Sequence, residues 1–176
     1  MRYIAATVIT LAVASLCACV DVGHDASAAP QAGEDGPVSA VTVTFSDEVK
    51  QLAATDPRLT PDEVAIAVEH ELQAHQLYAP AAPNVQRSLA ITVQNFTNSL
   101  ASNTKILGYS FHNMMLNGTV QLQGAAGSGQ PAFDVRARIR IRTRSADAEG
   151  GSLAQLYARF AVVTVAAMRG VEPPGP

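Results

Sequence analysis

The chain has 176 residues, of which 48% are hydrophobic, 15% charged and 5% aromatic. This length suits about one domain, and the apolar fraction is enough for one core, which excludes a disordered tail protein. The net charge of −3 excludes a generally basic nucleic-acid-binding protein. The two Cys, both within the first 19 residues, cannot build a disulfide framework.

The chain opens with a pattern typical of a secretory signal. Arg2 supplies a positive charge, and residues 3–18 form an almost uninterrupted run of apolar or small side chains. This run is shorter than the roughly 20 apolar residues that a membrane-spanning helix needs. Residues 1–18 are therefore predicted to be a signal peptide that is removed.

The apolar run closes with Leu16-Cys17-Ala18-Cys19. This sequence resembles the bacterial lipobox, in which an aliphatic residue and two small residues precede the lipidated Cys that becomes the mature N-terminus. The resemblance implies diacylglycerol and further acyl chains such as palmitate on Cys19. Each buried methylene contributes about 0.8 kcal/mol of anchoring, so two or three chains hold a protein firmly. Soluble secretion after cleavage at Ala28 is the alternative, although that site lies ten residues beyond the apolar run.

The residue after Cys19 is Val20 and not Asp. In enteric bacteria the resemblance then implies an outer-membrane lipoprotein, so we expect a cell-envelope protein that is lipid-anchored and faces the periplasm. Lipidation leaves no free thiol for disulfides or thiol catalysis. Residues 19–39 are predicted to be the lipidated Cys and a flexible tether with a reach of roughly 25 Å. A single domain is expected over residues 40–172.

The first predicted elements are a strand and a helix. Residues 41–45 alternate apolar and polar side chains, which is the period of a half-buried strand. Thr60-Pro61-Asp62-Glu63 is a capping box that predicts a helix from Pro61 to about Leu77, ended by Pro80 and Pro83. One stripe of this helix carries Val64, Val68, Leu72 and His75.

Three strands and a second helix are predicted next. The strands cover residues 89–94, part of 106–123, and 133–143, and Asn113 or Asn117-Gly118 could divide the second of them. Ser152 caps a helix that ends near Met168. The order β-α-β-β-β-α has short connections that favour antiparallel neighbours. We expect an α+β fold in which two helices pack on one face of a curved, mainly antiparallel sheet and leave the other face open. This order resembles a loose group of small bacterial lipoproteins of unknown function.

Five arginines occupy every second position of the last predicted strand. They are Arg136, Arg138, Arg140, Arg142 and Arg144. Strand geometry points all five to one face, at about 7 Å intervals, so together they form a candidate face for binding an anionic envelope component. Two other interpretations stay open: the arginines are simply solvated, or they pair with acidic residues, eleven of which lie between Asp21 and Glu71. The facing positions are expected to be Thr119, Gln121 and Gln123, which would make a polar surface without carboxylates.

Motifs of catalysis or metal binding are not matched. His70 and His75 are five residues apart, about 140° around a helix, and cannot share one ion as the His pair of H-E-x-x-H does; we expect one exposed and one semi-buried histidine. Residues 108–112 lack the last Gly of G-x-S-x-G, and residues 127–132 match G-x-G-x-x-A before a strand and not before a helix. No cofactor, metal or enzymatic activity is predicted; Ser110 and His112 are the first residues to test for one.

The leading hypothesis is therefore a non-enzymatic, membrane-anchored lipoprotein that binds or scaffolds another envelope component through the arginine face. The alternative is an accessory lipoprotein of an envelope transporter that presents a lipid or other apolar ligand. In that case a groove between the first helix and the sheet would be lined by Val64, Val68, Leu72 and Phe96. The partners expected are the membrane and an anionic envelope component, with no nucleic acid.

Overall fold

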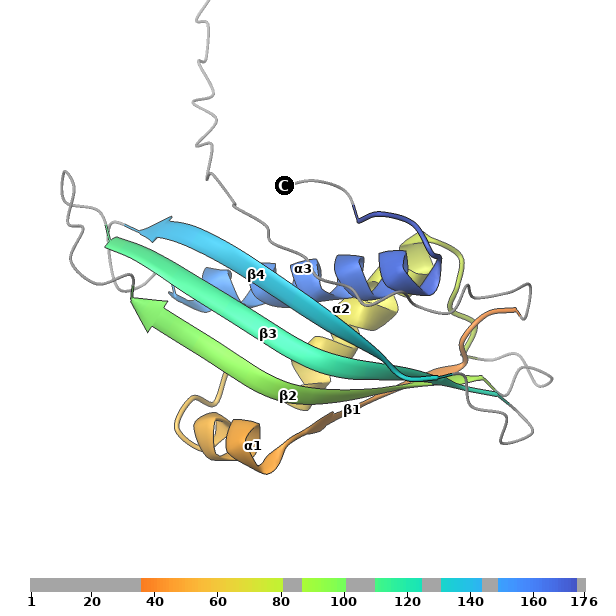
Figure 1. The fold of residues 1–176 in the computed structure, drawn as a ribbon, viewed down its shortest axis with the longest axis horizontal. Coiled ribbons are helices and arrows are strands. Elements are labelled where there is room, and N and C mark those ends of the chain that lie inside the picture. The colour runs from red at the N-terminus through yellow and green to blue at the C-terminus, as the bar shows by residue number, and fades with distance from the viewer. Residues whose placement is uncertain (1–35, 81–86, 101–109, 125–130, 144–148, 174–176) are drawn as a thin grey trace, which may run out of the picture.

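The computed structural model describes residues 36–80, 87–100, 110–124, 131–143 and 149–173, and within these ranges it contains four strands and three helices (Figure 1). The elements are β1 (Ala40–Phe45), α1 (Asp47–Ala53), α2 (Pro61–Ala74), β2 (Ser88–Leu100), β3 (Ser110–Gln123), β4 (Phe133–Thr143) and α3 (Glu149–Met168). The predicted α+β class is confirmed, and α1 is an additional helix.

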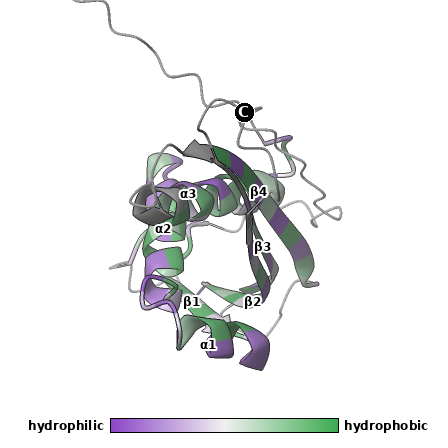
Figure 2. Ribbon diagram, turned by 90° about the vertical axis from the view of Figure 1, so that its left-hand side faces the viewer, coloured by the Kyte–Doolittle hydropathy of each residue, from purple (hydrophilic) through white to green (hydrophobic). Residues whose placement is uncertain are grey.

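The four strands form one mixed sheet in the order β1-β2-β3-β4. β2 pairs antiparallel with β3, and β3 with β4, so the sheet is mainly antiparallel as predicted. β1 runs parallel to β2, and for this pair the expectation of antiparallel neighbours is wrong. The chain between them contains α1 and α2, which is the long crossover that a parallel pair requires. Figure 2 shows α2 and α3 on the same side of the sheet.

α1 has a clear local cause that the apolar pattern did not reveal. The hydroxyl of Ser46 caps it by accepting a hydrogen bond from the backbone N–H of Val49, and Asp47 and Glu48 occupy the first turn. Only Val49 is buried on this short helix, at 0% exposure. A helix with a single core residue has no apolar repeat from which to predict it.

α2 begins where the capping box predicts but ends earlier. The Thr60 hydroxyl accepts from the N–H of Glu63, which confirms the predicted N-cap. The last helical residue is Ala74, because Gln76 takes a left-handed conformation with φ of 58° and the N–H of Leu77 bonds the carbonyl of Leu72. This is a Schellman motif, so the helix ends through its own backbone turn before the prolines are reached.

The other bounds also depart from the predicted ones. β3 is one continuous strand, and β2 continues past residue 94 to Leu100 through an irregularity between Val93 and Asn95. α3 starts at Glu149, three residues before the predicted cap at Ser152, and it ends at Met168 as predicted. Within the described residues, no helix is long and apolar enough to cross a membrane.

A single core lies between the helices and the inner face of the sheet. Val64, Val68 and Leu72 of α2 are fully buried, as the predicted stripe requires, and α3 adds Phe160 at 0% exposure. The Phe160 ring lies against β3 at Gly118, where a Cβ atom would come within 3.2 Å of the ring and 3.1 Å of a β2 backbone oxygen. The absence of a side chain at Gly118 therefore lets α3 approach the sheet closely.

Tyr157 connects α3 to the loop that precedes α2. Its side chain is 4% exposed, and its hydroxyl donates a hydrogen bond of 3.1 Å to the backbone oxygen of Arg58. Burial of the phenol, with further contributions from the carboxylates of Asp56 and Glu63, raises the pKa of Tyr157 to about 12. The neutral phenol is thus stabilised by the folded state.

This shift predicts a loss of stability in alkali. Because the folded pKa is about 12 against an ordinary value of 10.0, the contribution of Tyr157 is complete below pH 10 and is lost as the pH rises toward 12. The free energy of unfolding, measured by urea denaturation, should fall by about 2–3 kcal/mol more in the wild type than in Tyr157→Phe across this interval. Equal losses in the two proteins would contradict the assignment.

Candidate functional site

The outer face of the sheet, defined here as the face turned away from α2 and α3, carries the arginine pattern of β4. Arg138 and Arg140 are exposed and Arg136 is partly exposed, whereas the intervening Val135 and Ala137 are at most 1% exposed. Figure 2 shows the resulting alternation of hydrophobic and hydrophilic bands along β4. The period of two predicted from the sequence therefore holds along the described part of this strand.

The two remaining arginines of the pattern are described only in part or not at all. Arg142 belongs to β4 and pairs with Phe111 of β3, so its backbone position has the same parity as Arg140. Arg144 lies outside the described residues. Cys19 also lies outside them, as does the whole lipobox.

The strand register places different residues beside the arginines than the sequence suggested. Arg140 pairs with Asn113, Arg138 with Met115 and Arg136 with Asn117. The expectation that Gln121 and Gln123 lie beside the arginines is wrong. β4 begins at Phe133, opposite Val120, so the two glutamines pair with β2 instead. Thr119 does face β4, but at Asp134, so this surface includes one carboxylate.

A groove of about 370 Å³ crosses the outer face from β2 to β4. Its lining combines cationic, hydroxyl, amide and thioether side chains: Thr97, Ser99, Asn113, Met114, Met115, Arg138 and Arg140. Met115 is partly exposed, whereas the side chain of Met114 points into the core and is 3% exposed. The groove thus brings two neighbouring guanidinium groups together with hydrogen-bonding groups from two other strands.

The arginines differ in the hydrogen bonds and ion pairs that they form with neighbouring side chains. The Nε of Arg136 donates to the Oδ1 of Asn117 at 3.3 Å, and Arg136 and Arg140 also have further interactions. Among the described residues, none forms a hydrogen bond or ion pair with Arg138. At the start of β4, the Thr119 hydroxyl donates to Asp134 at 2.8 Å and accepts from the Gln94 amide at 2.6 Å. The groove therefore lies beside an internally bonded polar cluster.

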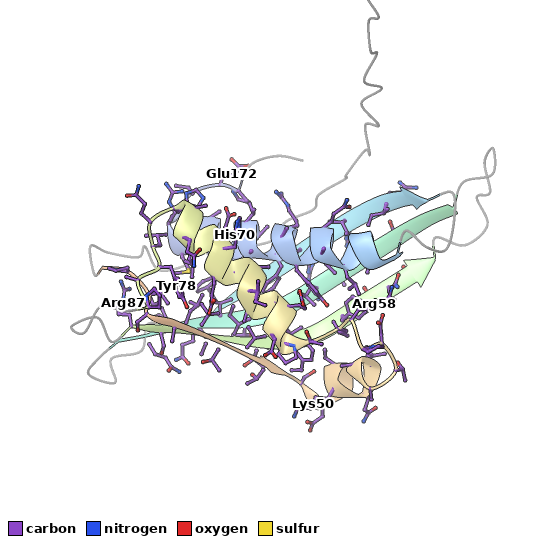
Figure 3. The ribbon with its side chains drawn as sticks, turned by 180° about the vertical axis from the view of Figure 1, so that it is seen from behind. Lys50, Arg58, His70, Tyr78, Arg87 and Glu172 are labelled. Atoms are coloured by element: carbon purple, nitrogen blue, oxygen red, sulfur yellow. The ribbon has the colours of Figure 1, made fainter. Side chains whose placement is uncertain are left out.

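Two described acidic residues, Asp47 and Asp56, have local partners and do not pair with the arginines of β4. Asp47 accepts a hydrogen bond from Lys50 at 2.9 Å, which lowers the pKa of that carboxyl, and Arg58 does the same for Asp56 at 2.8 Å. Figure 3 shows Lys50 and Arg58 at α1 and the loop that follows it. These two carboxylates are therefore not among the acidic residues that could pair with the arginines of β4.

An apolar groove was expected between the first helix and the sheet. This expectation is wrong for the four residues that would line it. Val64, Val68 and Leu72 are fully buried and Phe96 is 9% exposed, and all four belong to the packed core. Because all four are buried in the core, their side chains are in contact with protein atoms.

His70 and His75 have different surroundings in the structure. His70 is exposed on α2 (Figure 3). His75 is exposed and not semi-buried as expected; its Nε2 lies 3.1 Å from a Glu71 oxygen and its Nδ1 3.1 Å from an Arg169 nitrogen. Because Arg169 donates to Nδ1, the His75 proton is on Nε2, and the ring joins the ends of α2 and α3.

The part of the chain that the structure describes holds no cluster of three metal-ligating side chains. Ser110 and His112 lie in β3 with side chains outside the description, and residues 127–130 lie outside the described ranges altogether.

No protein-family model matches the chain, and no curated protein matches it. Among solved structures, it is similar to the PelC dodecamer from Paraburkholderia phytofirmans, with a TM-score of 0.46 and 15% identity over 86% of this chain and 99% of that chain. A minor lipoprotein from Acinetobacter baumannii gives a TM-score of 0.45 and 12% identity over 80% and 99% of the two chains. For rare lipoprotein B from Shewanella oneidensis the values are 0.40 and 16%, over 74% and 89%. Similarities this low assign the chain to none of these families.

Proposed function

We propose that the protein is a non-enzymatic lipoprotein of the cell envelope that binds an anionic envelope component in the groove on the outer face of its sheet. The lipid on Cys19 would hold it at the membrane, and the segment before β1 would connect the anchor to the domain. The observation that carries the binding role is the convergence of Arg138 and Arg140 with polar side chains of β2 and β3.

The anchor rests on the lipobox-like sequence. Leu16 and Ala18 have the size that the pattern asks for, and the apolar run before them is too short for a permanent membrane span. The described fold supports a tethered arrangement in one respect: Val38 is already buried and its N–H bonds the carbonyl of Leu77, so the domain is fixed from this point on. A lipidated Cys19 would then be separated from the domain by the segment in between.

The binding role rests on the chemistry of the groove. Guanidinium groups present paired N–H donors that fit carboxylate or phosphate oxygens, and two of them about 7 Å apart attract anionic groups more strongly than one. Thr97, Ser99 and Asn113 add neutral hydrogen-bonding groups, and Met115 adds an apolar surface. Hydroxyl, amide, thioether and guanidinium groups together make a lining suited to binding an anionic ligand.

The lipobox-like sequence predicts a lipid on Cys19. The intact mass of the mature N-terminal peptide should show a diacylglyceryl-modified Cys19, and Cys19→Ala should move the protein out of the membrane fraction because the acyl chains are lost. An unmodified N-terminus near Ala29 would contradict the anchor and indicate soluble secretion.

The groove is expected to bind a polyanionic probe. Fluorescein-labelled poly-L-glutamate should bind the purified full-length protein with an affinity that falls as salt is added. Arg138→Glu with Arg140→Glu should weaken binding about tenfold, because each exposed ion pair contributes up to about 1 kcal/mol and a tenfold loss of affinity corresponds to about 1.4 kcal/mol. Anisotropy titrations would measure the change.

Arg138→Glu is also measured alone, with Lys50→Glu as its matched control, since each of these single substitutions changes the net charge equally and Lys50 lies on α1. The control should bind the probe as the wild type does. Unchanged affinity in the double arginine variant, or absence of any binding to the wild type, would overturn the proposed binding role.

A further inference from the structure

β4 is the last strand of the sheet, and its far side is a sheet edge. In the order β1-β2-β3-β4 it pairs with β3 alone among the described strands. In an antiparallel pair, every second residue turns its backbone N–H and C=O away from the partner strand. Along the 11 residues of Phe133–Thr143, this creates a row of donors and acceptors directed at the sheet edge. Figure 1 shows β4 at that edge.

β4 lacks several of the features that normally keep an edge strand from pairing, although its outward arginines are a feature of that kind. Such strands are usually short, or carry Pro, a bulge or an inward-pointing charge. Phe133–Thr143 contains no Pro or Gly, and its register with β3 runs without a shift from Ser110↔Thr143 to Val120↔Phe133. From Phe133 to Ile141, its inward positions are apolar and buried. β1, at the opposite edge, has only six residues.

The charges of β4 determine which strand could be added. Same-face side chains of adjacent strands lie about 5 Å apart, where opposite charges stabilise the pair and like charges destabilise it. A second copy that paired through its own β4 would place its arginines beside Arg136, Arg138 and Arg140 on the same face. Self-pairing at this edge is therefore opposed by charge, and a strand with acidic residues on that face is favoured.

We infer that the edge of β4 receives an extended segment of a partner protein in which acidic residues alternate with apolar ones. This inference rests on the proposed function and specifies its anionic component as a protein strand. The segment adds a fifth strand by backbone hydrogen bonds. Its acidic side chains lie beside Arg136, Arg138 and Arg140 on the outer face, and its apolar side chains continue the inner face beside Val135 and Ala137.

The probe that tests this is a fluorescein-labelled peptide of alternating Glu and Val, about seven residues long, which is the length of a typical strand. A block isomer with all Glu before all Val has the same composition and charge. The alternating peptide should bind the full-length protein about tenfold more tightly than the block isomer, since only the alternating order puts every carboxylate on one face. Arg138→Glu should weaken its binding, and Lys50→Glu should not.

Backbone N-methylation separates strand addition from general charge attraction. One peptide carries N-methyl groups on its Val residues and another on its Glu residues. Only one of these two sets can donate to β4, so one peptide should lose binding and the other should keep it. The alternating peptide should also slow amide hydrogen exchange in 133–143 and leave 40–45 unchanged.

Equal binding of the block isomer and of both N-methylated peptides would overturn the inference. If poly-L-glutamate still bound through Arg138 and Arg140 in that case, the proposed groove function would stand. If poly-L-glutamate failed to bind at all, the proposed function itself would fall, whatever the alternating peptide does.

Discussion

The alternation of β4 between buried apolar side chains and outward arginines is the constraint on which the rest of the structure depends. A slip of one residue in this strand would bury Arg138 and Arg140 and expose Val135 and Ala137. Burial of a guanidinium group without a partner costs far more than burial of an alanine or valine contributes. The register with β3 is therefore set by the core, and it fixes which β3 residues stand beside the arginines.

The helical layer makes this alternation possible by covering one face. α3 lies against β4 and α2, and the Phe160 ring approaches β3 closely at Gly118. Tyr157 ties the same helix to the loop before α2 through the Arg58 carbonyl. With Asp47 and Asp56 paired to Lys50 and Arg58 on the helical side, the basic groups of the outer face lie in a different layer from these carboxylates.

Features set by local pattern could be predicted from the sequence, and features set by long-range pairing could not. β1, the start of α2 at Thr60 and the two faces of β4 follow from alternation or from a capping box, which involve neighbours in the chain. The parallel pairing of β1 depends on the crossover, and the groove depends on the β2–β3–β4 register. No local signal of the sequence places Thr97 in register with Arg138 or Ser99 in register with Arg140.

The end of α2 and the surroundings of its apolar stripe show the same limit. The end of α2 was expected at the prolines, but a left-handed Gln76 ends it first, and glutamine is not a residue that signals this conformation. The apolar stripe of Val64, Val68 and Leu72 was correctly placed on one helix face. Whether that face lines a ligand groove or fills the core depends on what packs against it, and the structure shows the core.

Methionine oxidation tests the central claim, an accessible outer face bearing the groove, most directly. Met114 and Met115 are adjacent in sequence but point to opposite faces, and Met114 and Met168 are 3% and 5% exposed. With dilute hydrogen peroxide, peptide mass spectrometry should show sulfoxide first at Met115, and poly-L-glutamate should slow it there. Oxidation of Met114 as fast as Met115, or no protection by the probe, would contradict this account.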